Sequence, residues 1–270
     1  KKSRQLSCQC IPRSDCELKV RLNAKFSPLH PPLKTTARLY DIRPVTENMS
    51  EFCFQTEQPA QFSAGQFALF DMLGVEGSRA YSMSNVENDD KRWHFIVKKM
   101  PAGQGSTRLF EHYQVGDTLS LDGPYGLSFL QAGIQRDIVC LAGGSGLSPE
   151  MSILRAAVAA PDLAQQNIYL FYGGRTPDDI CSADLIEQDA ELSQRVQHYN
   201  VVSDREAAKQ AGWNGDVGYV HELLTDKLSK SLDNYEYYVC GPAPMIDAVL
   251  KKLIVEHKVP LEQIHYDRFY

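Results

Sequence analysis

The stretch "RAYSMSN", from Arg79 to Asn85, places a cation, a phenol ring and small hydroxyls on one short predicted strand. Few of these side chains are apolar, so the stretch is poorly suited to a hydrophobic core. A guanidinium forms charge-assisted hydrogen bonds with phosphate oxygens, and an aromatic side chain packs against other flat rings. The residue types therefore indicate a nucleotide cofactor with a diphosphate and a flat ring. Taken alone, Tyr81 is equally well explained as an edge-strand aromatic residue.

A second motif, "GQGS" from Gly103 to Ser106, follows in the same half of the chain. We expect Ser106 to cap the start of a helix, because hydroxyl oxygens accept hydrogen bonds from the free backbone N–H groups there. Such a helix start would be a second site for an anion.

The glycine-rich stretch "CLAGGSGLSPEM" follows an apolar run that predicts a buried strand. Its glycines let the backbone turn tightly and come close to a ligand. We expect Ser148 to cap the next helix and Pro149 to occupy its first position, which would direct free N–H groups at a diphosphate. The spacing differs from the dehydrogenase fingerprint. A tight strand-to-helix turn without a ligand is the alternative.

Three further predicted strands also end in polar or glycine-rich residues: "YGGR" (172–175), "VVSDRE" (201–206) and "VCGPAPM" (239–245). In an open parallel sheet, ligands bind beyond the carboxyl ends of the strands. These ends therefore predict one shared crevice. Cys240 is either a small buried residue or a residue at the border of that crevice.

The pattern of elements changes near residue 136. Residues 35–131 contain short alternating strands separated by Gly and Pro, with one helix predicted over "STRLFEHY", which indicates an antiparallel barrel or sandwich. Beyond residue 136 strands and helices alternate, which indicates a parallel sheet with crossover helices. These helices are predicted over "SPEMSILRAAVAA", "SADLIEQDAELSQR", "VHELLTDKLSKSL" and "PMIDAVLKKLIVEHK".

The bulk composition restricts the class of protein. The 270 residues suggest two domains, and 43% hydrophobic with 23% charged residues is typical of a globular protein. A net charge of −6 argues against nucleic acid as a partner. No apolar run reaches the roughly 18 residues that span a bilayer, and no signal peptide is apparent, so we expect a cytoplasmic protein without a membrane partner. Its seven cysteines are then expected to be thiols.

In chain order, R-x-Y-S, G-x-x-S, G-G-S-G-x-x-P and C-G-P-x-P-M, followed by an acid and aromatics at the chain end, resemble the ferredoxin–NADP reductase superfamily. The similarity extends from Thr35 to Tyr270. "DGPYGLS", "GYVHE" and "KVPLEQIHYDRFY" more narrowly resemble the reductase components of bacterial multicomponent aromatic-ring oxygenases, such as those of toluene monooxygenase and of carbazole and benzoate dioxygenases.

The resemblance implies a β plus α/β architecture. An antiparallel flavin-binding β-barrel is expected over residues 35–132, followed by a doubly wound parallel-sheet NAD(H)-binding domain over 133–270. Residues 1–25 resemble the end of a plant-type ferredoxin domain, and residues 26–34 read as a proline-rich linker.

The ferredoxin-like pattern "LSCQCIPRSDCELKV" implies that Cys8 is the fourth ligand of a [2Fe–2S] cluster in a longer parent protein. The other three ligands would form C-x4-C-x2-C, which this sequence does not contain, so we expect the chain to bind no iron. A zinc site at Cys8, Cys10 and Cys16 is the alternative, but it lacks a fourth ligand.

The resemblance also assigns roles at the flavin. Arg79 is expected to pair with the FAD diphosphate, Tyr81 to lie against the isoalloxazine ring, and Ser82 to hydrogen-bond near its reactive N5 edge. Either Phe269 or Tyr270 would cover the other face of the ring. The implied FAD-binding residues are Arg79, Tyr81, Ser82, Val97, Lys98, Gly103, Gly105, Ser106, Thr107 and Phe269.

On the nicotinamide side, the resemblance places the ring near Cys240. The implied catalytic residues are Ser82, Cys240, Asp267 and Phe269. The implied NADH-binding residues are Gly143, Gly144, Ser145, Gly146, Tyr172, Gly173, Arg175, Ser203, Asp204, Cys240, Gly241, Pro242 and Met245. Asp204 favours NADH over NADPH, because a carboxylate repels a 2′-phosphate.

The implied function is an FAD-dependent NADH oxidoreductase that passes single electrons through a [2Fe–2S] centre to an oxygenase or its ferredoxin component. A general ferredoxin or flavodoxin reductase of the same superfamily is one alternative. A non-catalytic nucleotide-binding regulator is another. The residues do not indicate the oxygenase substrate.

Overall fold

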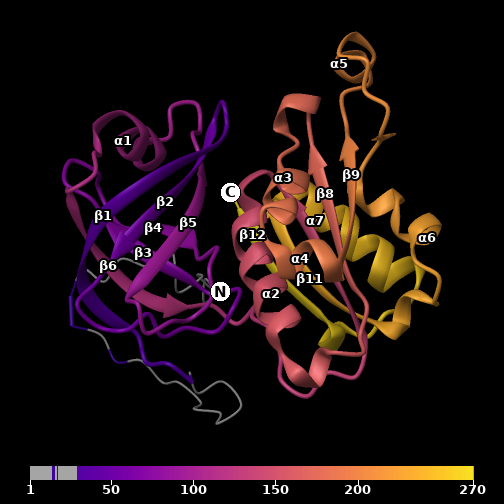
Figure 1. Ribbon diagram of the computed structural model, residues 1–270, viewed down its shortest axis with the longest axis horizontal. Coiled ribbons are helices and arrows are strands. Elements are labelled where there is room, and N and C mark those ends of the chain that lie inside the picture. The colour runs from indigo at the N-terminus through magenta and orange to yellow at the C-terminus, as the bar shows by residue number, and fades with distance from the viewer. Residues whose placement is uncertain (1–13, 16, 18–28, 270) are drawn as a thin grey trace.

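The computed structural model describes residues 14, 15, 17 and 29–269. The strands of this part of the chain form two six-stranded sheets (Figure 1). The antiparallel barrel and the parallel α/β sheet predicted from the sequence are both confirmed. Cys8, Cys10 and Cys16, on which the predicted iron ligand and its zinc alternative depend, lie outside the described residues, and so does Tyr270.

The first sheet is antiparallel and closes into a barrel. Its strands run in the spatial order β4-β3-β6-β1-β2-β5. A hydrogen bond of 2.7 Å from the backbone N–H of Ser84 to the carbonyl of His94 joins the two edges. The strands are β1 (Leu33–Thr46), β2 (Met49–Gln55), β3 (Phe67–Asp71), β4 (Arg79–Ser82), β5 (Arg92–Lys98) and β6 (Thr118–Tyr125).

Aromatic side chains fill the barrel because alternate residues of each strand point inward. Phe70 contacts Phe54 and Phe95 edge to face, with ring centroids 5.3 and 4.7 Å apart. The helix α1 (Gln104–His112) packs against this core through the buried Leu109, and its Phe110 contacts Phe52.

The second sheet is parallel, with the order β10-β9-β8-β7-β11-β12. Its strands are β7 (Asp137–Gly143), β8 (Ile168–Gly174), β9 (Val196–Val202), β10 (Asp216–Val217), β11 (Tyr235–Pro242) and β12 (Ile264–Phe269). Its helices are α2 (Leu147–Ala159), α3 (Ser182–Glu187), α4 (Ala190–Arg195), α5 (Arg205–Gln210), α6 (Leu224–Lys227) and α7 (Ala243–Leu250).

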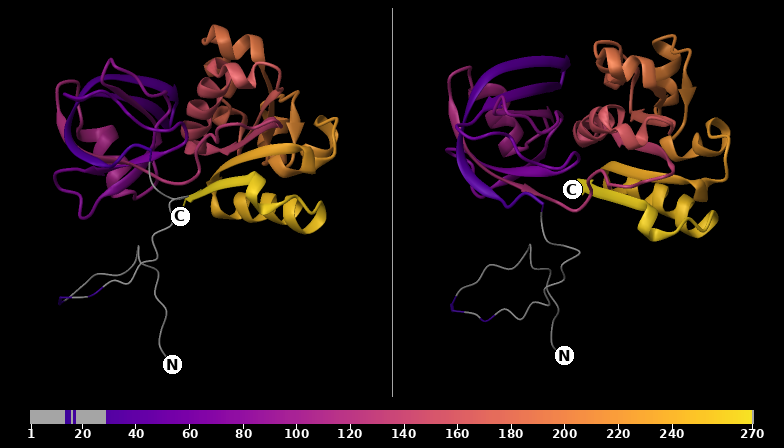
Figure 2. Two further views of the ribbon diagram at one scale, coloured as in Figure 1. Left: turned by 90° about the horizontal axis from the view of Figure 1, so that it is seen from below. Right: turned by 60° about the horizontal axis from the view of Figure 1, so that its bottom comes forward.

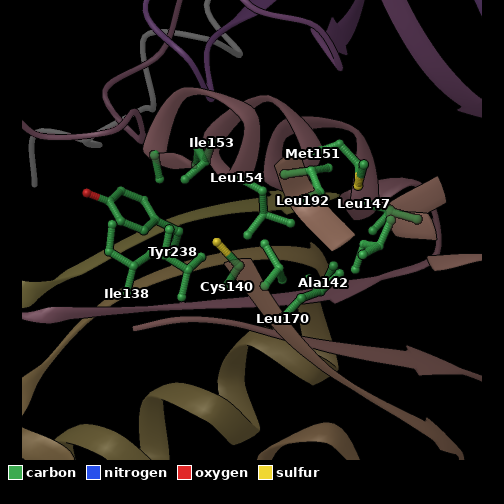
Figure 3. Packing of buried hydrophobic residues seen from close by; sticks show 14 of the residues in the cluster. Ile138, Cys140, Ala142, Leu147, Met151, Ile153, Leu154, Leu170, Leu192 and Tyr238 are labelled. Carbon is green, nitrogen blue, oxygen red and sulfur yellow. The ribbon is translucent and has the colours of Figure 1, made fainter. Parts of the chain in front are cut away.

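Helices cover both faces of this sheet, as expected for a doubly wound fold. The helices α2, α3 and α4 bury one face, and Figure 3 shows side chains of α2 such as Leu147 and Met151 packed above Cys140, Ala142 and Tyr238. The helices α6 and α7 bury the other face. Among the described residues, none of the helices combines the length and the apolar composition needed to cross a bilayer.

Three of the predicted helices differ from the observed ones. The predicted helix over residues 182–195 is two helices, because Asp189 accepts hydrogen bonds from the N–H groups of Glu191 and Leu192 and so starts α4. The segment "VHELLTDKLSKSL" forms only a 3-10 turn and the short α6. The last predicted helix continues from α7 into a π-helical stretch, Lys251–Glu256.

Candidate functional site

A cavity of about 1090 Å³ lies between the barrel and the carboxyl ends of the parallel strands. Ligand pockets are typically about 300–1,000 Å³, so the space accommodates a large ligand or two adjacent ones. The end of β12 reaches this cleft between the domains (Figure 2). Seventeen of the predicted site residues line this cavity: Arg79, Tyr81, Ser82, Val97, Lys98, Gly103, Gly105, Ser106, Phe269, Gly143, Gly144, Ser145, Gly173, Arg175, Ser203, Pro242 and Met245.

On the barrel side, Arg79 supplies a cation that the preceding loop holds in place. Its Nη1 donates hydrogen bonds to the carbonyl oxygens of Glu76, Gly77 and Ser78 at 3.0, 3.2 and 3.2 Å. A Cβ at Gly105 would lie 2.8 Å from Cγ of Arg79, so only glycine fits beside this side chain. The loop and the glycine together leave the guanidinium positioned at the cavity for an anion.

Ser106 does not cap the helix α1, contrary to the prediction. The N-cap position belongs to Gly103 and has no side-chain hydrogen bond. Instead, Oγ of Ser106 accepts a hydrogen bond of 3.0 Å from the N–H of Met100. The serine thus fixes the loop that enters the helix.

The aromatic and hydroxyl side chains of β4 face the cavity from its wall. The ring of Tyr81 packs against Phe70, with centroids 4.9 Å apart. Burial raises the pKa of Tyr81 to about 12, so its hydroxyl stays protonated. Ser82 is almost fully buried and lines the cavity next to it. This wall offers a flat ring and a hydrogen-bonding hydroxyl to a ligand.

On the other side, the "GGSG" turn packs onto the "CGPAPM" segment. A Cβ at Gly146 would lie 2.1 Å from the carbonyl oxygen of Cys240, and one at Gly143 would lie 2.7 Å from Sδ of Met245. The close approach requires glycine at position 146, where the Cβ would meet backbone atoms, whereas at position 143 it would meet the flexible side chain of Met245. The turn brings backbone N–H groups at the start of α2 toward the cavity, which suits a diphosphate.

Ser148 does not cap α2, because Gly146 is the N-cap residue and α2 begins at Leu147. Pro149 is accordingly the third residue of the helix and not the first. Oγ of Ser148 instead reaches the barrel, where it donates to the carbonyl of Ser82 at 2.7 Å and accepts from the N–H of Ile96 at 3.0 Å.

Two further side chains of α2 continue this contact with the "RAYSMSN" stretch. Oγ of Ser152 donates to the carbonyl of Asn85, and Nη1 of Arg155 donates to the carbonyl of Ser84, each at 2.6 Å. These residues lie on one face of the helix. The strand that carries Ser82 is thereby fastened to the helix that starts at the "GGSG" turn.

Lys98 contacts the second domain directly. Its Nζ forms an ion pair of 2.9 Å with Oδ1 of Asp179, whose other oxygen accepts hydrogen bonds from the N–H groups of Arg175 and Thr176. Burial opposes ionisation of Asp179, but the hydrogen bond and charge of Lys98 and the two backbone hydrogen bonds together outweigh it and lower the pKa of Asp179. The pair lies where the large cavity meets a smaller one of about 410 Å³.

Several predicted site residues do not line the large cavity. Tyr172 is buried in the core and donates hydrogen bonds to the carbonyls of Asp179 (3.2 Å) and Gly144 (3.4 Å), so it supports the "GGSG" turn from behind. Asp204 is the N-cap of α5 and lines the smaller cavity with Arg175. The others that do not line it are Thr107, Gly146, Cys240, Gly241 and Asp267.

Cys240 and Asp267 lie side by side behind the cavity wall, as register partners of β11 and β12. Burial raises the pKa of the Cys240 thiol well above its usual range, so the thiol is neutral. Burial also raises the pKa of Asp267 to about 6. A carboxyl group with such a pKa can take up and release a proton near neutral pH.

The sequence analysis missed Tyr219 and His221, which line the cavity after β10. Their rings are stacked, with centroids 6.0 Å apart and planes at 20°, and Tyr219 is largely exposed. An exposed aromatic pair is a suitable surface for a flat base. The string "GYVHE" contained the signal, but only as part of a family resemblance.

One cluster of described residues outside the cavity has donor atoms spaced as for a metal: Glu51, Cys53 and His94. Both oxygens of Glu51 already accept hydrogen bonds, from Ser84 at 2.7 Å and from Arg43 at 3.1 Å. Burial and the nearby Glu51 raise the pKa of Cys53 to about 12, so its thiol is a poor ligand. Hydrogen bonding to the barrel edge accounts for this cluster.

Comparisons with known proteins assign each half of the chain to a domain family. The oxidoreductase FAD-binding domain family matches residues 36–129, and the oxidoreductase NAD-binding domain family matches residues 140–251. A ferredoxin–NAD(P)(+) reductase of Metapseudomonas resinovorans is 36% identical over all of this chain and 79% of that protein. The chain belongs to this family of FAD- and NAD-binding ferredoxin reductases.

Other members of the ferredoxin reductase family agree in sequence and in fold. The ferredoxin–NAD(+) reductase component of an alkene monooxygenase system of Xanthobacter autotrophicus is 31% identical over all of this chain and 80% of that protein. The solved structure of the ferredoxin reductase in carbazole 1,9a-dioxygenase matches 98% of this chain and 78% of that chain, with a TM-score of 0.87 and 36% identity.

The residues of the cavity fit the two cofactors of the ferredoxin reductase family. The barrel side, which the FAD family matches, combines the cation of Arg79 with the glycine cradle at Gly105. The opposite side, which the NAD family matches, supplies the "GGSG" turn at the start of α2. The cavity thus lies between the FAD-binding domain and the NAD-binding domain, and each domain contributes one wall.

Proposed function

We propose that the protein oxidises NADH through FAD in this cavity and serves as the reductase of an oxygenase system. Named relatives of this kind support the proposal, because they are reductase components of alkene, phenol and carbazole oxygenase systems. The observation that carries it is the single cavity that joins the FAD wall, with Arg79 and Tyr81, to the "GGSG" wall.

When bound, FAD accepts a hydride from NADH and releases the two electrons singly. We assign the protein the tasks of binding, orientation and proton handling. Arg79 would hold the FAD diphosphate, Tyr81 would pack against the ring system, and Ser82 would direct its hydroxyl at the reactive edge. Phe269 lines the cavity from the end of β12, which supports a role in covering the opposite face of the ring.

On the nicotinamide side, Gly143, Gly144 and Ser145 would contact the NADH diphosphate. Cys240 contributes a neutral thiol next to Asp267, whose carboxyl group would accept the one proton set free overall when two one-electron acceptors oxidise NADH. The hydrogen bond from Ser148 to the Ser82 carbonyl would hold the two walls of the cavity in a fixed relative position. Lining residues thus bind the cofactors, and the residues behind them set geometry and protonation.

Asp204 supports a preference for NADH. Its carboxylate faces the smaller cavity beside Arg175, next to the strand ends where an adenosine ribose would lie. A carboxylate repels the 2′-phosphate of NADPH. Steady-state rates should give a higher kcat/KM for NADH, and an equal or higher value for NADPH would contradict this assignment.

The proposed function is tested with FAD-loaded protein and two electron acceptors. We expect NADH-dependent reduction of ferricyanide, a small acceptor that reaches the flavin directly. We expect slow reduction of cytochrome c, because that acceptor normally draws electrons through an iron–sulfur cluster, for which only Cys8 is predicted as a ligand here. Failure to reduce ferricyanide would contradict the proposal, and stoichiometric iron with cluster absorption would contradict the prediction for Cys8.

A further inference from the structure

Glu150 is a buried carboxyl group with no cationic partner among the residues that the structure describes. It lies in the first turn of α2, its side chain is 1% exposed, and within the described residues its Oε2 has no hydrogen-bond partner. A buried polar atom without a partner is costly, and a bare buried carboxylate is far more costly. The packing of the helix alone does not account for such a residue.

The start of α2 places Glu150 over the carboxyl ends of the central strands. Gly146, four residues earlier, lies directly against the carbonyl of Cys240, and residues four apart share a helix face. The next turns of α2 pack on Cys140 and Tyr238 (Figure 3). Glu150 therefore lies between α2 and the strands β7 and β11.

The strand register brings Asp267 to the same place. Cys240 is the partner of Asp267, and two residues earlier Tyr238 is the partner of His265. The rings of Tyr238 and His265 are stacked at 5.0 Å and 19°, so register partners on this face point the same way. Asp267 consequently flanks Cys240 on the face that α2 covers.

Glu236, another buried carboxyl group on this sheet, shows what Glu150 lacks. Its Oε2 accepts hydrogen bonds of 2.9 and 2.7 Å from Arg136, and its Oε1 lies 2.7 Å from Nε2 of His265. Both oxygens of Glu236 thus have a cation or an imidazole as a partner, which compensates for the burial of the carboxyl group. Glu150 has no such partner, and a buried acid in that position keeps its proton.

The groups that face Glu150 are neutral or acidic. Burial, together with a smaller effect of the negative charge of Asp267, raises the pKa of Glu150 to about 8 against the opposing effect of a hydrogen bond with Cys140. Burial also raises the pKa values of Cys140 and Tyr238 on β7 and β11. Near neutral pH, Asp267 is then the charged member of this group.

We propose that Glu150 is a positioning residue that remains a neutral acid behind Cys240 and so limits this group of described residues to one negative charge, that of Asp267. The inference rests on the proposed function. Oxidation of one NADH by two one-electron acceptors yields NAD⁺, two reduced acceptors and one proton. Asp267 accepts this proton and releases it, whereas a second anion at Glu150 would hold the proton on Asp267.

Infrared spectroscopy tests the protonation state without turnover. We expect the 270-residue chain at neutral pH to show the carbonyl stretch of a buried, protonated carboxyl group, which disappears as the pH rises through about 8 and is missing in Glu150→Gln. Identical spectra for the wild type and the variant near neutral pH would show that Glu150 is ionised, which would overturn the proposal.

Thermal unfolding gives a second readout. The pKa of Glu150 is higher in the folded state than in the unfolded chain, so its favourable contribution is present at low pH and is lost as the pH rises through the unfolded pKa toward about 8. We expect the melting temperature of the wild type to fall relative to that of Glu150→Gln between about pH 4.5 and pH 8, and the difference to stay constant above that range. Glu236→Gln serves as the control and should be less stable at every pH, with the pH slope of the wild type. Parallel curves for Glu150→Gln and the wild type would contradict the proposal.

The pH profile of ferricyanide reduction tests the role in catalysis. We expect kcat of the wild type to fall roughly tenfold per pH unit above about pH 8, with KM for NADH unchanged, and kcat of Glu150→Gln to stay level. The same alkaline fall in both proteins would overturn the role of Glu150. If the wild type does not oxidise NADH although the infrared band is present, the proposed function fails, whereas a missing band removes the role of Glu150 alone.

Discussion

The two domains contact each other in two different ways on the two sides of the cleft. Ser148, Ser152 and Arg155 of α2 form hydrogen bonds with the backbone of the "RAYSMSN" stretch, and the Ser148 contacts are fully buried. Lys98 and Asp179 form an ion pair in the cavity wall, with side chains 27% and 14% exposed. Buried hydrogen bonds have specific geometry and resist salt, whereas partly exposed ion pairs are weak and screened. The α2 contact therefore fixes the two walls, and the ion pair leaves room for adjustment when ligands enter.

The largest effect is expected at Arg79, which lines the cavity and is proposed to bind the FAD diphosphate. We expect Arg79→Ala to weaken FAD binding by roughly 10- to 100-fold, from the roughly 1.5–3 kcal/mol of a charge-assisted hydrogen bond. Flavin fluorescence titration measures the affinity. Arg92→Ala, which removes an exposed barrel cation outside the cavity lining, is the matched control. Unchanged FAD affinity in Arg79→Ala would remove the diphosphate assignment.

Removal of the buried contact should have the next largest effect. Ser148→Ala leaves the Ser82 carbonyl and the Ile96 N–H without their partner, so we expect a loss of about 1–3 kcal/mol in the free energy of unfolding. The loss appears as a lower melting temperature together with a lower kcat, because the strand that carries Ser82 loses its support. Ser193→Ala, in an exposed position of α4, is the control.

A Ser148→Ala protein with the stability and kcat of the wild type would mean that the α2 contact does not fix the walls. A loss of stability without a loss of kcat would mean that Ser148 stabilises the fold and does not affect the position of Ser82 during catalysis.

Ser148 also marks the limit of what the sequence could predict. Its position after a glycine-rich turn predicts a helix cap, since that preference is local. The structure uses Gly146 for the cap and directs Ser148 to a strand 66 residues away along the chain, a pairing that no local pattern reveals. In contrast, strand patterns and residue types predicted the architecture of two sheets. They also predicted that the "GGSG" and "RAYS" segments lie near a ligand, and residues of both segments line the cavity.

Tertiary placement explains two other differences between the predicted and the observed site. Tyr172 follows the pattern of a strand end, but the sheet places its side chain in the core under α2, where it supports the turn. Tyr219 and His221 reach the cavity through a loop after β10, a strand of two residues that is too short for a periodic signal. Tertiary placement, which local residue types do not encode, decides both cases.

The ion pair should give the smallest effect. We expect Lys98→Ala to change the free energy of unfolding by about 0.2–1 kcal/mol, with the difference from the wild type decreasing as salt is added, because the pair is partly exposed. Melting temperatures at low and high salt measure this. A loss as large as that of Ser148→Ala, insensitive to salt, would reverse the comparison between the two contacts.

The central claim is that NADH and FAD meet in the cavity between the two domains, and anaerobic titration of FAD-loaded protein with NADH tests it most directly. We expect one equivalent of NADH to bleach the flavin absorption of the wild type. We expect Gly146→Val, which places side-chain atoms against the Cys240 carbonyl, to retain FAD and to bleach far more slowly. An FAD-loaded wild-type protein whose absorption does not change with excess NADH would contradict the account.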